Sequence, residues 1–382
     1  MGFMAEGEHG GAHDGPIAPA VPSRVNRRSL LLGGSATAAV GVTVVVVARD
    51  TRPPPADEAS LAAARESAAV PASNFDDIPG ISSFNTPIGD HYVIDTAFEK
   101  PVVDPDTYTL RVGGEFVSNP LTLTYDDLLR RDLITRQLVL AGVSNPVGGD
   151  LVGNAVWTGV SLTELLDEAG IEDPTNPDHQ IFSRSVDGYT AGFRVPVAYD
   201  GRSAMVALAI NGEPLPVDHG FPARLLVNGL YGYTSSTKWL ESIEVNDFLS
   251  NDAFWIPRGW AKEAPVKTQS RIDTPGDRDD LVAGPTTIAG VAWAPGRGVS
   301  GVEVGFASFG DPEVVEWFEA ELATVESAET WVQWRYDWDA PEGSWTIQVR
   351  ATDGGGVTQS ETPVAPPPDG AEGFHTVFGR TV

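Results

Sequence analysis

The chain has 382 residues, of which 41% are hydrophobic and 9% aromatic, and its 53 acidic and 25 basic residues give a formal net charge of −28. This length and hydrophobic content predict two folded units plus a tail, and they exclude a largely disordered chain. The charge argues against nucleic acid as a partner and against adsorption to an anionic membrane, because both bind clusters of lysine and arginine. There is no cysteine, which excludes disulfides, thiolate nucleophiles and cysteine-ligated metals.

The N-terminal segment has the pattern of an export signal. Residues 1–28 combine a Gly-, Ala- and Pro-rich start, expected to be disordered, with a basic stretch ending in Arg27 and Arg28, and residues 29–48 are uncharged and apolar. The paired arginines resemble a twin-arginine signal, which predicts export to the outer face of the cytoplasmic membrane. As a helix the apolar stretch would be roughly 28 Å long, so it suits a cleaved signal or a retained anchor, with a buried helix as the alternative. Residues 49–80 read as a linker.

Residues 81–262 mix the signals of short strands and short helices. Strands are expected at residues 108–112, 205–210 and 238–245. The strand at 205–210 leads into the hairpin dipeptide Asn211-Gly212. Thr124 can cap one short helix, and a capping-box pattern at Ser161 and Glu164 predicts another over residues 162–169. This mixture predicts an α+β fold class.

Residues 263–382 carry almost no helix signals. Short alternating runs separated by Gly, Pro and Asp predict a small β-sandwich with strands at residues 286–293, 299–306, 331–338 and 344–351. One helix is expected at residues 312–322. Four tryptophans in these strands are expected to pack in the core or at a subunit interface, and a ligand-binding aromatic face is the alternative. They are Trp331, Trp334, Trp338 and Trp345.

Two segments of the first domain suit an anionic ligand. His219 and Arg224 lie in one short segment, and a guanidinium beside an imidazole attracts anions. Residues 231–238 add hydroxyl groups and the ammonium group of Lys238. The alternative for His219 is a simple hydrogen bond to a backbone carbonyl in a turn. From these residues alone, the prediction is a site for a phosphorylated or otherwise anionic small molecule.

Motifs in a fixed order along most of the chain resemble the sulfite oxidase family of molybdopterin-dependent oxidoreductases. In the first domain they are DPDTYTLRV at residues 104–112, VSNPVGGDLVGN at 143–154, WTGV at 157–160, NGEPLP at 211–216, HGFPAR at 219–224 and KW at 238–239. In the second they are KTQSRI at 267–272, VAW at 291–293 and QVRATD at 348–353. The resemblance covers residues 81–382. It implies a molybdopterin-binding α+β domain followed by an immunoglobulin-like β-sandwich that forms a homodimer.

The resemblance also implies roles for individual residues. His219 and Arg224 correspond to the residues on the phosphate side of the pterin, and Ser236 and Lys238 to those that close the pocket. Tyr189 resembles the catalytic tyrosine near the metal. The other cofactor-binding residues that the resemblance implies are Asp95, Thr96, Ser144, Asn145 and Asp187.

The chain departs from the family pattern at Gly142, which stands where the family has its metal-ligating cysteine. Val93 replaces the arginine of the bacterial Tyr-Arg-Ile-Asp-Thr motif, and Asn228 replaces a proline. With Gly142, no side chain at this position can bind molybdenum, and losing a thiolate changes both the coordination and the potential of a metal.

Three functions are compatible with these observations. The first is an exported oxidoreductase that transfers an oxygen atom to or from a small oxyanion or S-oxide and passes electrons to a separate electron-transfer protein. The second is a pterin-binding pseudoenzyme of the same fold, which Gly142 and Val93 favour over the first. The third is a non-catalytic scaffold, and the cluster of His219, Arg224 and Lys238 argues against it, because an unused pocket has no need for those charges.

Overall fold

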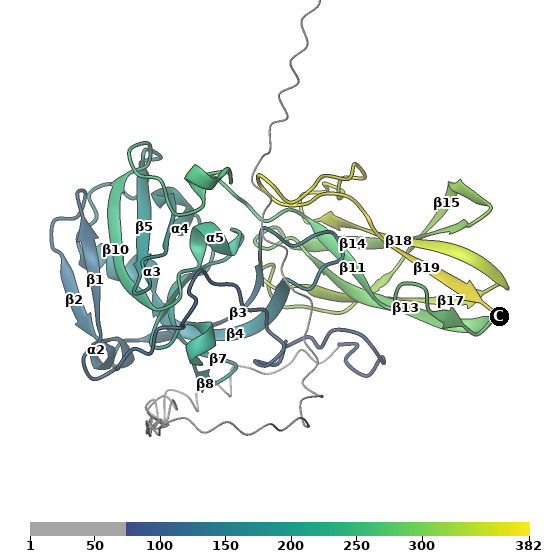
Figure 1. Cartoon of the computed structure of the whole chain (residues 1–382), viewed down its shortest axis with the longest axis horizontal. Coiled ribbons are helices and arrows are strands. Elements are labelled where there is room, and N and C mark those ends of the chain that lie inside the picture. The colour runs from purple at the N-terminus through teal and green to yellow at the C-terminus, as the bar shows by residue number, and fades with distance from the viewer. Residues whose placement is uncertain (1–73) are drawn as a thin grey trace, which may run out of the picture. The chain divides into compact units, whose positions relative to one another are not determined.

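The computed structural model describes residues 74–382, and most of its ordered elements are β-strands (Figure 1). The α-helices are α2 (Tyr125–Leu129), α3 (Leu162–Glu168), α4 (Val195–Ala198) and α5 (Gly232–Ser235), and the 3₁₀ turns are η1 (Val217–His219) and η2 (Ile256–Arg258). Strands therefore dominate the first domain more than the α+β prediction implied. The expected export segment at residues 29–48 and most of the linker lie outside the described residues. Within residues 74–382, no helix has both the length and the apolar character needed to cross a membrane.

The first sheet of the N-terminal part joins segments that are far apart in the sequence. Its strand order is β2 (Leu121–Thr124), β1 (Thr109–Gly114), β10 (Leu240–Asp247), β5 (His179–Ser185) and β6 (Thr190–Arg194). β1 and β10 are parallel, and the other pairs are antiparallel. Because Leu240 pairs with Ser185, the first residue of β10 lies beside the turn between β5 and β6.

The second sheet carries the loop that contains Gly142. Its strands are β3 (Leu133–Ala141), β4 (Val152–Ser161), β7 (Ala204–Ile210) and β8 (Glu213–Pro214), and β9 (Arg224–Val227) pairs with β7. Apolar side chains of both sheets, among them the fully buried Trp157, form one hydrophobic core with α3. β3 ends directly before Gly142, and β9 begins at Arg224. The sheet therefore fixes the backbone at both positions.

Several local predictions for this part are confirmed. Ser161 caps α3 by accepting a hydrogen bond from the N–H of Glu164, although the reciprocal capping box forms at Thr124 and Asp127 instead. The hairpin after β7 forms as expected at residues 211–212, where both residues have positive φ angles as a type I′ turn requires. The strand expected from residue 238 begins at Leu240, because Trp239 has a φ of 49° that is incompatible with a strand.

The C-terminal part consists of two further sheets. One has the order β11 (Gln269–Thr274), β13 (Gly284–Trp293), β17 (Val332–Ala340) and β16 (Glu321–Leu322). The other has the order β12 (Asp280–Leu281), β19 (His375–Thr381), β18 (Gly343–Asp353), β14 (Val299–Ser308) and β15 (Asp311–Glu319). Both sheets contribute side chains to one core that contains Trp334 and Trp338, which confirms core packing for these two tryptophans.

The helix expected at residues 312–322 is wrong. This segment forms the edge strand β15, which pairs with β14, and the short strand β16, which pairs with β17 (Figure 1). The glutamates that favour a helix locally stand on edge strands, where charged side chains face solvent at little cost and discourage pairing with other chains. Pairing with β14 therefore outweighs the local propensity.

The C-terminal sheets pack directly against the N-terminal part. A third hydrophobic cluster combines Tyr231 and Tyr233 with Val291, Trp293 and Trp331. Trp331 is 1% exposed, and its indole N–H donates to the backbone oxygen of Phe84 at 2.9 Å. The described residues fall in one compact unit, so the division between residues 81–262 and 263–382 stays a prediction.

Candidate functional site

Arg224, the first residue of β9, is a buried cation without a buried anion beside it. Its side chain is 7% exposed, and its Nε donates to Ser236 Oγ at 2.9 Å. Nη1 donates to the backbone oxygen of His219 at 3.4 Å. Among residues 74–382, no carboxylate forms an ion pair with this guanidinium. Burial lowers the pKa of Arg224 to about 10, and a buried unpaired charge is costly, so the site favours an anionic ligand.

His219 offers a second buried group to the same ligand. It ends η1 and is 2% exposed. Its Nε2 lies 3.2 Å from the backbone oxygen of Ile88 and must donate to it, which leaves Nδ1 without a partner. Burial, and then the charge of Arg224, lower the pKa of His219 to about 4. His219 therefore makes the backbone hydrogen bond that the sequence offered as an alternative, and it still has one ring nitrogen free for a ligand. A bound anion would favour protonation of Nδ1.

Lys238 and Asp95 form a buried ion pair next to this group. Lys238 is 8% exposed, and its Nζ lies 2.8 Å from Asp95 Oδ2 and 3.1 Å from the backbone oxygen of Asp218. Burial lowers the pKa of Lys238 to about 8, and the charge of Arg224 acts in the same direction. Trp239, the residue after Lys238, has a positive φ angle. Asp95 therefore neutralises Lys238 in this structure, while the adjacent Thr96 is exposed.

Asp187 and Tyr189 come from the turn between β5 and β6. The Asp187 carboxylate accepts a hydrogen bond from the backbone N–H of Tyr189 at 3.0 Å. The Tyr189 hydroxyl donates to the backbone oxygen of Tyr233 at 2.7 Å, and its ring packs against Phe254. Burial raises the pKa of Tyr189 well above its usual value, so its phenol stays protonated at neutral pH.

The loop between β3 and β4 holds the residues that the sequence placed near the metal. The N–H of Gly142 donates to Leu151 O at 2.9 Å, and Asn145 Oδ1 accepts from Leu151 N–H at 2.9 Å, so both residues close the loop. Asn145 lines a small hollow together with Trp293, and Ser144 is exposed. Arg224, His219, Ser236 and Lys238 are called the Arg224 group below. Within the described residues, no hydrogen bond joins Thr96, Ser144 or Asn145 to this group.

Sequence reasoning missed His91, which completes the buried group. His91 is 3% exposed, and its ring lies 5.5 Å from that of His219 and 5.7 Å from that of Trp157, in both cases edge to face. Its Nε2 has no hydrogen-bond partner, and burial lowers its pKa to about 3. Its position directly before Tyr92, in the segment that also holds Asp95, was the available signal.

The described residues contain no group of three His, Cys, Asp or Glu side chains that could hold a metal. What they contain is a set of donors for an anion. Hydrogen bonds link Arg224 to Ser236 and His219, and Lys238 and Tyr189 lie near enough for the charge of Arg224 to lower the pKa of each.

Comparisons with known proteins relate the chain to molybdopterin-binding oxidoreductases. The family model for the oxidoreductase molybdopterin binding domain matches residues 97–255. Human mitochondrial sulfite oxidase is 28% identical over 308 residues, which cover 70% of this chain and 55% of that protein. The sulfite oxidase of Arabidopsis thaliana is 29% identical over 269 residues, which cover 59% of this chain and 68% of that protein. The chain spans about half the length of the animal sulfite oxidases that it matches.

The fold also resembles that of a solved structure. Sulfane dehydrogenase SoxCD from Paracoccus pantotrophus matches with a TM-score of 0.60 at 22% identity, over 73% of this chain and 77% of that one. This likeness indicates a shared, mostly β fold. The domain match and the sulfite oxidases confirm the molybdopterin cofactor and the resemblance expected from the motifs. The chain carries a molybdopterin-binding domain at residues 97–255, and its sequence resembles the sulfite oxidase family of molybdopterin-dependent oxidoreductases.

Proposed function

We propose that the chain is an oxidoreductase that transfers an oxygen atom to or from a small oxyanion or S-oxide. In this proposal Arg224, His219 and Lys238 hold the phosphate of molybdopterin, with Ser236 as a further donor. The observation that carries it is the buried guanidinium of Arg224 without a carboxylate, beside the unpartnered Nδ1 of His219. These donors fit a phosphate, because a buried phosphate needs arginine or lysine together with further hydrogen-bond donors.

The donor set does not extend to the metal. Gly142 has no side chain to offer, and the described residues contain no other cluster of metal ligands. When bound, the cofactor supplies the two-electron redox chemistry of oxygen-atom transfer. The protein's part, in this proposal, is to hold the phosphate, position the substrate and exclude water. Asp95, Thr96, Ser144, Asn145 and Asp187 are proposed as further cofactor contacts from the loops around the group.

Tyr189 is proposed as the catalytic residue that donates a hydrogen bond to an oxygen of the substrate. Its phenol is protonated because burial raises its pKa, so it can donate at neutral pH. In the present arrangement it donates to Tyr233 O, and it would have to exchange that partner for the substrate. Val93, 41% exposed where the family has arginine, provides no charge for an oxyanion. This favours a substrate less dependent on a cationic side chain than sulfite.

The remaining parts of the proposal concern the whole protein. The C-terminal sheets are proposed to be an immunoglobulin-like domain that forms a homodimer, with residues 81–262 and 263–382 as the two domains. Residues 1–28 and 29–48 are proposed to direct twin-arginine export, with the protein at the outer face of the cytoplasmic membrane. Electrons would pass from the cofactor to a separate electron-transfer protein.

The first test is the ratio of molybdenum to protein, measured by elemental mass spectrometry on the chain expressed with residues 1–48 intact. We expect a ratio near one that falls at least tenfold in Arg224→Gln. Arg111→Gln is the matched control, because Arg111 is an exposed arginine paired with Glu241. Wild-type protein without molybdenum, from cells that make the cofactor, would favour the scaffold instead.

Loaded protein is then mixed anaerobically with sulfite while its visible spectrum is recorded. In a second experiment, the protein is first reduced and then mixed with dimethyl sulfoxide. A spectral change with either compound that Tyr189→Phe slows supports oxygen-atom transfer. Full molybdenum occupancy with no reaction toward any oxyanion or S-oxide would identify a pterin-binding pseudoenzyme.

A further inference from the structure

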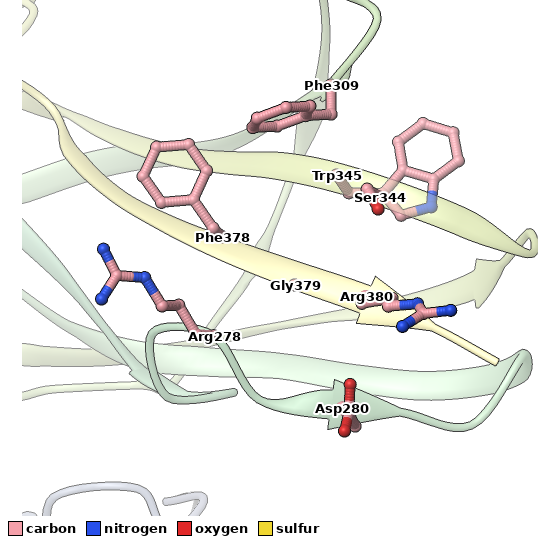
Figure 2. A pocket seen from close by; sticks show the side chains of 8 residues that line it. All are labelled: Arg278, Asp280, Phe309, Ser344, Trp345, Phe378, Gly379 and Arg380. Atoms are coloured by element: carbon pink, nitrogen blue, oxygen red, sulfur yellow. The ribbon is translucent and has the colours of Figure 1, made fainter.

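A surface groove lies on the five-stranded sheet of the C-terminal part, and it shares no residue with the Arg224 group. Its volume is about 310 Å³. The residues that line it are Arg278, Asp280, Phe309, Ser344, Trp345, Phe378, Gly379 and Arg380 (Figure 2). They come from β12, β18 and β19 and from the turns before β12 and after β14.

The aromatic side chains of the groove are held in place by their neighbours. The rings of Phe309 and Phe378 meet edge to face with centroids 6.4 Å apart, although the two residues are 66% and 40% exposed. Trp345 pairs with Gly379 and therefore faces the opposite side of the sheet from Phe378, where its ring packs edge to face on Trp338 and its indole N–H donates to Pro341 O at 3.1 Å. Exposed aromatic surface of this kind commonly marks a binding site.

The groove carries positive charge on a strongly acidic chain. Phe378 and Arg380 are two residues apart on β19, so their side chains lie on the same face of the sheet. Arg380 is exposed and, within residues 74–382, forms no ion pair, even though Asp280 is its neighbour in the pairing of β12 with β19. Arg278 is 81% exposed and has a carboxylate no nearer than the 3.8 Å contact with its own neighbour, Asp277.

Arg278 has a backbone conformation that directs it to this groove. Its φ is 65°, in the left-handed region that non-glycine residues rarely adopt. Its N–H donates to Phe378 O at 2.6 Å, and the N–H of Phe378 donates to Asp277 Oδ1 at 3.1 Å. Such a conformation persists only where the surroundings enforce it, and it often accompanies a functional site. Figure 2 shows Arg278 toward one end of the groove and Arg380 toward the other.

We propose that this groove binds a small organic anion with a flat apolar body. The body would lie against Phe309 and Phe378, and the carboxylate or sulfonate would pair with one of the two guanidinium groups, Arg278 or Arg380, at the ends of the groove. Exposed arginines alone hold an inorganic anion weakly, because water screens the pair. An apolar body without charge would gain nothing from the two guanidinium groups. The combination of both features therefore selects an amphiphilic anion.

The probe for the test is 1-anilinonaphthalene-8-sulfonate, with N-phenyl-1-naphthylamine as its uncharged analogue. Titrations are followed by probe fluorescence on folded full-length protein at low salt. We expect one site for the sulfonate, a dissociation constant at least tenfold higher in Arg278→Gln/Arg380→Gln, and less than twofold change for the uncharged analogue. Asp280→Asn should bind the sulfonate more tightly, because it removes a like charge from the edge of the groove.

Arg335→Gln is the matched control. It lies on β17 in the other sheet of the C-terminal part and should leave the sulfonate affinity unchanged. Far-ultraviolet circular dichroism of every variant establishes that it is folded. The proposal is overturned if Arg278→Gln/Arg380→Gln binds the sulfonate within twofold of the wild type. It is also overturned if the uncharged analogue binds as tightly. Conversion of a wild-type dimer to a monomer by Arg278→Gln/Arg380→Gln, measured by light scattering, would likewise overturn it, because the groove would then be an interface between two copies.

Discussion

The δ1 carbon of Ile94 lies 3.2 Å from the position that a β-carbon on Gly142 would occupy. The β-carbon of Leu151 lies 3.4 Å from the same position, and Gly142 does not have a positive φ. A side chain at Gly142 therefore needs a shift of a few tenths of an ångström at the flexible end of Ile94. The β-carbon of a cysteine at this position would therefore need little rearrangement.

Gly142→Cys should fold with a free energy of unfolding within about 1 kcal/mol of the wild type, because the overpacking is small. We expect it to retain more molybdenum through gel filtration, with its thiol protected from Ellman's reagent in the loaded protein and reactive in the cofactor-free protein. Gly142→Ala adds the same β-carbon without sulfur. Equal molybdenum retention by the alanine and cysteine variants would show that the thiolate is irrelevant to the metal.

Arg224→Met should separate cofactor binding from stability. In the cofactor-free protein the guanidinium is buried without an anion, so its replacement should leave the free energy of unfolding unchanged or raise it by about 1 kcal/mol. Molybdenum occupancy should fall at least tenfold. Arg271→Met is the comparison, because Arg271 pairs with the nearly buried Asp273. Its loss leaves a buried carboxylate and should cost about 3 kcal/mol in urea denaturation. Equal destabilisation by both substitutions would contradict the anion site.

The stability of the cofactor-free protein should depend on pH through His219. Its folded pKa of about 4 lies below the usual 6.5, and the groups that act on it are Arg224, Lys238 and Asp218. Both states are neutral above pH 6.5. As the pH falls from 6.5 to about 4, the unfolded chain takes up a proton that the folded protein does not, so stability is lost, by roughly 3 kcal/mol from this residue.

His219→Gln should therefore show a flatter decline of unfolding free energy between pH 6.5 and 4 than the wild type does. His91→Phe should act in the same direction, because burial lowers the pKa of His91 to about 3. Bound phosphate would raise the pKa of His219, so the loaded protein should lose less stability in this window. Urea denaturation at several pH values measures the pH dependence of stability in both variants and in the loaded protein. A wild type and a His219→Gln variant with parallel pH profiles would contradict a neutral buried imidazole.

Local sequence patterns predicted much of the fold, because they act over a few residues. The cap at Ser161 and the turn at residues 211–212 form where their side chains and φ preferences require. The error at residues 312–322 has the opposite cause. Its glutamates favour a helix locally, but the segment pairs with β14, and pairing with a distant strand is not visible in a local pattern.

The candidate site was predicted less completely than the fold. Motifs identified His219, Arg224 and Lys238, which the structure brings together. They did not reveal that Lys238 is neutralised by Asp95, or that His91 lies against His219. Both relationships join segments more than a hundred residues apart, and only the folded chain shows which buried charges are left unpaired.

Asn228, which stands where the family has proline, connects the two parts of the chain. Its Nδ2 donates to Glu329 O at 3.0 Å, and its backbone N–H donates to Ser203 O at 2.9 Å. The Glu329 carboxylate in turn accepts from the N–H and the hydroxyl of Ser203, both at 2.6 Å. Asn228 is fully buried. A proline here would lose both hydrogen bonds that Asn228 donates and remove the backbone donor to Ser203 O.

Asn228→Pro should therefore lower the free energy of unfolding by about 2–3 kcal/mol, and Asn228→Ala by about 1–2 kcal/mol, because the alanine retains the backbone bond. Asn228→Ala and Glu329→Gln should be non-additive by at least about 0.5 kcal/mol, since the amide of Asn228 donates to the backbone oxygen of Glu329, the residue that the second substitution changes. Urea denaturation of the single and double variants measures this coupling. Asn119→Ala is the control, because it removes a similar amide-to-backbone bond at an exposed position and should cost little. An Asn228→Pro variant as stable as the wild type would show that the asparagine does not tie the C-terminal sheets to the site domain.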